Sequence, residues 1–210
     1  MKCIYELDVI KIVGERYPIR RAYGCRIGMF STKEKAEKAI RNNVKKNNNL
    51  PIEVKDIILG YILKELLIND SEDNYSYICS YTADGTLNDV NMMDRSRKYH
   101  GRPKECIRFN VGDIVEVYGG QDVELCIVAA TPPTTEVFLH IKQRAETEME
   151  KQGIKGYQYE MDDSDDQYMV YPMRGDYHLH IRSELVFKPT KKVSKALRNQ
   201  LQAQLKNPNI

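Results

Sequence analysis

The stretch that decides the fold reads VGDIVEVYGGQDVELCIVAA and runs from Val111 to Ala130. Gly112 permits a bend before the first apolar run, because glycine adopts backbone conformations that other residues avoid. Residues 114–118 and 123–130 are both apolar and rich in valine, and the polar, glycine-containing segment 119–122 separates them. This spacing is typical of two antiparallel strands joined by a short turn.

One face of the first of these strands is wholly apolar. Val115 and Val117 both point to it, since side chains alternate across a strand. The order of a polar turn, a G-D-x-V-x-V strand starting at Gly112, a glycine turn and a second strand resembles the opening of SH3-like small β-barrels, including the Tudor, Agenet and KOW types. The resemblance implies a small barrel over residues 107–190 and carries no catalytic activity.

The remaining strands of such a barrel follow only after an interruption. Residues 167–171, 177–181 and 183–187 have strand-like patterns. Before them, residues 133–152 have a helical pattern that Thr131 can cap. Four side chains of that pattern recur on one helix face: Val137, Ile141, Ala145 and Met149. The sequence therefore predicts a barrel with a helical insertion between its second and third strands.

The sequence of residues 2–49 predicts two strands followed by a helix. Residues 2–13 and 22–30 are rich in Ile, Val and Tyr. The sequence Ser31-Thr32-Lys33-Glu34 then forms a capping box, in which the Ser31 oxygen accepts from a backbone amide and Glu34 reaches back. A helix is expected from there until the asparagine-rich residues 47–49.

Two more strands are expected before residue 92. Residues 54–68 are almost continuously apolar around Gly60, which favours a strand buried on both faces, although a helix also fits their spacing. Residues 75–82 alternate and lead into a turn at Gly85, which supplies a positive φ. Residues 1–92 thus predict an antiparallel β-β-α-β-β sheet with one covering helix.

Together these patterns predict an α+β protein of two parts, the sheet of residues 1–92 and the barrel of residues 107–190. A basic connection, residues 93–106, joins them, and residues 191–210 form a C-terminal helix that docks on the core or binds a partner. The entry Ile27–Ser31 to a capped helix, followed by the later barrel, resembles uncharacterised bacterial proteins, a resemblance that brings no activity with it.

Composition predicts a soluble, cytoplasmic protein. The 210 residues include 32 basic and 30 acidic ones, so the net charge of +2 recruits neither nucleic acid nor membrane. The longest apolar stretch, residues 57–68, contains Lys64 and Glu65 and falls short of the ~20 residues of a membrane span. The N-terminus lacks the apolar region of a signal peptide. Five cysteines without a C-x-x-C pair predict five free thiols.

Charge is unevenly distributed along the chain. Residues 95–108 and 177–210 carry net charges of +5 and +6, whereas residues 51–94 and 145–176 carry −7 and −6. The first basic run can neutralise phosphates without reading sequence. Its candidate contact residues are Arg95, Arg97, Lys98 and Arg102. Because the acidic segments oppose it, we expect at most weak, salt-sensitive nucleic-acid binding.

Metal and catalytic candidates are few. His178 and His180 project from one face of a predicted strand, and a metal site there needs further ligands from Asp176, His140 or His100. None stands at diagnostic spacing, so two ordinary strand histidines are the preferred interpretation. The acidic run 162–166 lacks the glycine and glutamate of a calcium loop and is interpreted as exposed. No catalytic motif is present, and we predict no catalytic residue, metal or cofactor.

Aromatic residues complete the candidate binding surface of the barrel. Their rings can stack a base, hold a cation or simply fill the barrel. They are Tyr118, Tyr168, Tyr171 and Phe187. The leading hypothesis is a non-catalytic binding or regulatory module that acts through a protein partner. The alternatives are a weak nucleic-acid-binding module using residues 95–108 and a small metal-dependent enzyme using His178 and His180. The oligomeric state is not predicted.

Overall fold

A computed structural model of the chain describes residues 3–14, 17–68, 75–91, 103–159, 166–174 and 177–206. The strands are β1 (Cys3–Val13), β2 (Ile19–Phe30), β3 (Ile57–Leu67), β4 (Tyr75–Thr82), β5 (Leu87–Asn91), β6 (Ile114–Tyr118), β7 (Asp122–Ala130), β8 (Gln167–Pro172), β9 (Leu179–Arg182) and β10 (Val186–Phe187). The helices are α1 (Lys33–Asn48), α2 (Thr135–Lys151) and α3 (Lys195–Lys206), and a 3₁₀ turn, η2, spans Ser183–Leu185.

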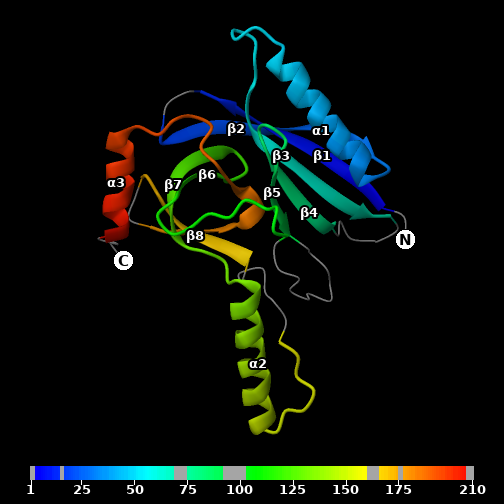
Figure 1. Ribbon diagram of the computed structural model, residues 1–210, viewed down its shortest axis with the longest axis vertical. Coiled ribbons are helices and arrows are strands. Elements are labelled where there is room, and N and C mark those ends of the chain that lie inside the picture. Colours follow the sequence, from blue (N-terminus) through cyan, green and yellow to red (C-terminus); the bar gives the residue numbers. More distant parts are fainter. Residues whose placement is uncertain are drawn as a thin grey trace.

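All described strands belong to one antiparallel sheet (Figure 1). Its order is β10-β6-β7-β2-β1-β3-β4-β5, and β8 and β9 extend from β7. The strand expected at residues 54–68 is confirmed as β3, which pairs with β1 and β4. The expected hairpin of residues 114–130 is also confirmed, since Ile114 pairs with Ile127 and Tyr118 with Val123.

The prediction of a separate small sheet and a separate SH3-like barrel is wrong. The start of β2 pairs with the start of β7, with Ile19 opposite Glu124 and Arg21 opposite Asp122. The two parts of the chain therefore share one sheet, because each of these strands pairs with its hairpin partner along one edge and with the other strand along its second edge. One core also draws on both parts, packing Ile10 and Leu59 with Phe187.

The two ends of the sheet path face each other, so the sheet is nearly closed into a barrel. Asn88 of β5 is fully buried, and its side-chain amide donates to the Val186 carbonyl oxygen of β10 at 2.8 Å and to Ser80 Oγ at 3.0 Å. The backbone carbonyl of Asn88 accepts from the Ile107 amide at 2.9 Å. We call this place, where β5 faces β10, the closing edge.

Helices α1 and α3 cover outer faces of the sheet (Figure 1). The predicted covering helix is confirmed as α1, whose Ala36 and Ile40 are buried against β1 and β3. Thr32 rather than Ser31 caps it by accepting from the Lys35 amide at 3.3 Å. In α3, Leu201 is fully buried in the same core as Leu125 and Ile127 of β7. Docking on the core is therefore confirmed for α3.

Helix α2 lies outside the strand order and extends away from the sheet (Figure 1). The predicted insertion is confirmed, with Thr134 rather than Thr131 as its cap. Val137 and Ile141 are largely exposed, whereas Phe138 is buried and packs on Tyr159 at 5.8 Å between ring centroids. Among the described residues, no helix has the length and apolarity that crossing a bilayer requires.

Candidate functional site

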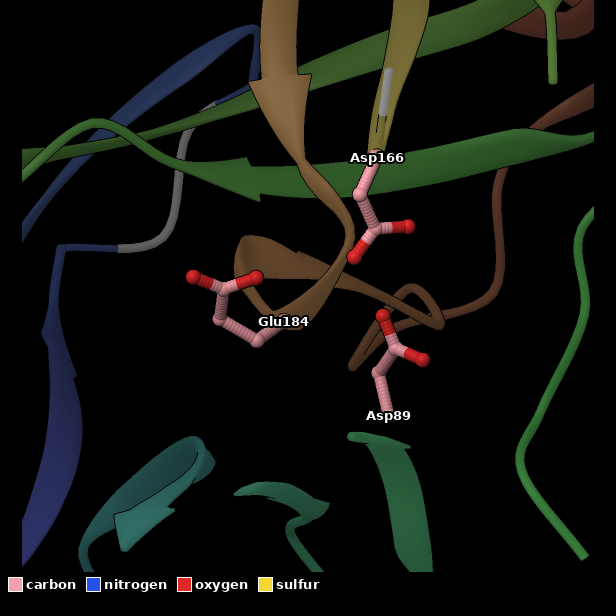
Figure 2. A group of neighbouring side chains, drawn as sticks. All are labelled: Asp89, Asp166 and Glu184. Atoms are coloured by element: carbon pink, nitrogen blue, oxygen red, sulfur yellow. The ribbon is translucent and has the colours of Figure 1, made fainter. Parts of the chain in front are cut away.

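Three acidic side chains meet in the interior beside the closing edge (Figure 2). Asp89 comes from β5, Asp166 immediately precedes β8, and Glu184 lies in η2. One carboxylate oxygen of each lies within 4.8 Å of the others, and the three residues are 2%, 7% and 2% exposed. We call these residues the carboxylate cluster. Within the described part of the chain, it is the one group that offers three candidate metal ligands.

Neighbouring polar groups orient the carboxylate cluster. The Ser183 hydroxyl lies 3.1 Å from both the backbone carbonyl oxygen and the Oδ1 of Asp166, so it holds that carboxylate in place. Asn91, at the end of β5, provides a side-chain hydrogen bond to Glu184. The turn η2 therefore supplies both a cluster member and a group that positions another, an arrangement typical of built polar sites.

Glu184 has the most perturbed environment of the three. Burial raises the pKa of its carboxyl from 4.5 to about 7, and the negative charge of Asp166 adds to this effect. The backbone amide of Glu184, Arg182 and Asn91 act in the opposite direction. Its Oε2 is buried and accepts no hydrogen bond from any described residue. A carboxylate oxygen in that state favours a proton or a cation.

A basic pocket lies at the start of α3, separate from the carboxylate cluster in its lining residues. It has a volume of about 640 Å³, and its lining includes the apolar residues Ile107, Ile114 and Val193 and one acidic residue, Asp113. Six basic residues line it: Arg108, Lys188, Lys191, Lys192, Lys195 and Arg198. Such an excess of positive charge around a concave surface attracts anionic groups.

The predicted aromatic residues do not form one surface. Tyr168 and Phe187 are buried in two different cores, and Tyr168 packs on Phe109 at 5.9 Å between ring centroids. Tyr171 is partly buried in the core under α3. Tyr118 lies at the end of β6, where its hydroxyl donates to the Gly120 carbonyl oxygen at 3.0 Å.

The predicted basic contact residues Arg95, Arg97, Lys98 and Arg102 lie outside the described residues. Arg108, from the end of the same run, lines the basic pocket. The other cations of the pocket follow β10, and all but Lys188 belong to the predicted C-terminal helix of residues 191–210, for which docking on the core or binding of a partner was expected. The net charge of +6 over residues 177–210 is the sequence feature that could have indicated this pocket.

The histidine pair lies away from any three-ligand group found among the described residues. His178 and His180 are exposed, with ring centroids 5.2 Å apart in a T-shaped arrangement. Of the proposed additional ligands, His140 lies exposed on α2, and Asp176 and His100 lie outside the described residues. The carboxylate cluster escaped prediction because its members stand far apart in the sequence, and only Asp166 belonged to a noted acidic run.

Comparison with known proteins gives no match from which a function could be transferred. No family model, no curated protein and no solved structure matches the chain. The described fold is an α+β architecture in which one antiparallel sheet nearly closes on itself. Its described residues include an open basic pocket and a buried carboxylate cluster as candidate sites.

Proposed function

We propose that this protein is a non-catalytic binding module whose basic pocket takes an acidic segment of a protein partner. The observation that carries the proposal is that six basic residues line the pocket and that Asp113 is the one acidic residue among its lining residues. Lys188, Lys192 and Lys195 are exposed, so a partner's carboxylates can reach them without displacing the core. Such charges accelerate association and favour a partner of opposite charge.

The lining of the pocket favours a peptide over a nucleic acid. Ile107, Pro189 and Val193 offer an apolar surface on which an aliphatic side chain can be buried. Nucleic-acid sites that tolerate any sequence instead present aromatic faces on which bases stack. Phe109 is the one aromatic residue in the pocket lining, and it is only 7% exposed. An acidic segment with an aliphatic anchor therefore fits this chemistry best.

The test measures fluorescence anisotropy with three probes and two matched variants. The probes are a labelled glutamate-rich peptide containing two leucines, the same peptide with alanines in their place, and a labelled oligothymidine. The pocket variant is Lys192→Gln, Lys195→Gln and Arg198→Gln. The control variant removes the same number of exposed charges from α1 through Lys38→Gln, Arg41→Gln and Lys45→Gln.

We expect the leucine peptide to bind most tightly at low ionic strength. The pocket variant should weaken binding by about tenfold or more, because each exposed charge pair contributes up to about 1 kcal/mol. The control variant should stay within about twofold of the unmodified protein. Tighter binding of oligothymidine, lost in the pocket variant, would instead make the pocket a nucleic-acid site. Equal affinities in the two variants, or no peptide binding, would also contradict the proposal.

A further inference from the structure

The carboxylate cluster has the chemistry of a site for a hard divalent cation. Carboxylate oxygens are the preferred ligands of such ions, and Ca²⁺ takes six to eight of them. Asp89, Asp166 and Glu184 together provide up to six oxygens. One oxygen of each lies within 4.8 Å of the others, so a point between the three lies at most about 2.8 Å from each of them. A small inward movement of the side chains would bring all three oxygens to the Ca²⁺–O distance of about 2.4 Å.

A second, independent observation for a cation site is a carboxylate oxygen of Glu184 that is unpaired among the described residues. It is 2% exposed, yet its Oε2 accepts no hydrogen bond from any described residue. Figure 2 shows one oxygen of its carboxylate on the side of Asp89 and Asp166 and the other turned away from them. Leaving a buried carboxylate oxygen without a partner is costly, and a cation among the three carboxylates removes that cost.

We propose that Asp89, Asp166 and Glu184 bind one Ca²⁺ ion that holds the closing edge of the sheet together. Asp89 stands on β5 beside Asn88, and Glu184 lies in η2, two residues before β10 begins. Ligands from both sides of the closing edge would thus share one ion. Mg²⁺ fits less well, since it retains several water molecules and the three residues are almost fully buried.

The site is separate from the proposed peptide-binding function. None of its three residues lines the basic pocket. Its role is structural, because a burial of 93–98% leaves no open face at which a substrate could meet the ion. An ion that binds the folded chain alone stabilises it in proportion to the logarithm of its concentration.

The experiment measures thermal unfolding of the full chain at about pH 8, after treatment with a chelator. We expect saturating Ca²⁺ to raise the melting temperature by roughly 5–10 °C, and Mg²⁺ to raise it less. Titration calorimetry should give one ion per chain. Sodium chloride at equal ionic strength serves as the control for screening.

Two variants separate the cluster from other buried acids. Glu184→Gln should abolish the shift caused by Ca²⁺ while leaving the ion-free protein at least as stable as the unmodified one, because a buried charge is removed. Glu124→Gln is the matched control. Glu124 also has a buried oxygen without a hydrogen bond to any described residue, but it lies outside the cluster, so the Ca²⁺ shift should persist.

A measurement on the unmodified protein covers the case in which a variant does not fold. Tb³⁺, which replaces Ca²⁺ at oxygen sites, should show tyrosine-sensitised luminescence that saturates at one equivalent and that excess Ca²⁺ abolishes. The absence of a Ca²⁺ shift, a larger shift with Mg²⁺, or a Ca²⁺ shift that survives Glu184→Gln would each overturn the proposal. Stabilisation by acidic pH without any response to Ca²⁺ at pH 8 would assign the cluster to protons instead.

Discussion

Among the described glycines, Gly60 leaves the least space for an added Cβ atom. It lies in β3, opposite Thr82 of β4 and under the ring of Phe187. A Cβ atom at this position would overlap the Tyr81 carbonyl oxygen and come within 2.7 Å of Phe187 Cε1. Backbone cannot move aside as the end of a long side chain can, so the fold requires glycine here for space.

Gly60→Ala should therefore destabilise the protein by about 2–4 kcal/mol, at or above the usual cost of overpacking a core. Gly24→Ala is the matched control within β2, because its new Cβ would meet only the Tyr118 hydroxyl at 3.8 Å. The control should change stability by less than about 0.5 kcal/mol. Urea unfolding of both variants measures the difference, and equal effects would show that β3 relaxes around residue 60.

Glu184 gives a pH dependence whose sign follows from its environment. The folded protein holds a proton on this carboxyl up to about pH 7, whereas the unfolded chain releases it near 4.5. The folded state therefore binds more protons between those values, and the stability of the ion-free protein should fall as the pH rises from 4.5 to 7. The full effect is on the order of 3 kcal/mol at 1.36 kcal/mol per pKa unit.

Urea unfolding in the presence of a chelator, from pH 4.5 to 8, measures this slope. Glu184→Gln should remove it, and Glu105→Gln, at an exposed position, should keep it. A slope of the same size in the Glu184→Gln variant would assign the pH dependence to other groups.

At the scale of elements, a buried ion pair connects strands that are distant in sequence. Arg20 of β2 donates through Nη2 to Glu116 of β6, and both side chains are fully buried. The same carboxylate accepts from the Tyr17 hydroxyl at 2.9 Å and from the Thr190 amide at 3.0 Å. The guanidinium also lies 5.0 Å from the centroid of the Tyr17 ring. The Glu116 carboxylate thus joins β6 to two other segments, residues 17–20 and the loop that contains Thr190.

Glu116→Gln should cost about 3–5 kcal/mol, because it leaves the Arg20 guanidinium buried without its counter-charge. Arg20→Met should cost a similar amount for the converse reason. The double variant should recover a large part of the loss, since a glutamine oxygen still accepts from Tyr17 and Thr190. A double-mutant cycle in urea measures the coupling. Additive effects of the two changes would show that the pair is not coupled.

At the scale of the whole molecule, the shared sheet makes the two parts of the chain one folding unit. Ile10 and Leu59, from the first part, pack in one core with Val123 and Phe187 from the second. Strand β2 pairs with both β1 and β7. Neither part can keep this core covered without the other.

The protein should consequently unfold in one cooperative transition. Backbone circular dichroism and the near-ultraviolet signal of tyrosines, which include Tyr61 in the first part and Tyr168 in the second, should change together with temperature. The calorimetric and van't Hoff enthalpies should agree. Two resolved transitions would mean that the parts fold separately despite sharing the sheet.

The sequence by itself determined most of the elements. Alternation and apolar runs identified the hairpin of residues 114–130 and the strand containing Gly60, and capping residues identified α1 and α2. These features depend on neighbours a few residues apart, which is why local patterns reveal them. The observed capping residues, Thr32 and Thr134, lie one and three residues after the predicted ones, because several neighbouring hydroxyls can cap each helix.

Only the tertiary structure decided how those elements join and where the sites lie. Pairing of β2 with β7 leaves no local signal, since either strand has the same pattern whichever neighbour it takes. The carboxylate cluster unites Asp89, Asp166 and Glu184, and the basic pocket unites Arg108 with the segment after β10. In both sites the chemistry arises from proximity between distant residues, which closure of the sheet creates and spacing along the chain does not record.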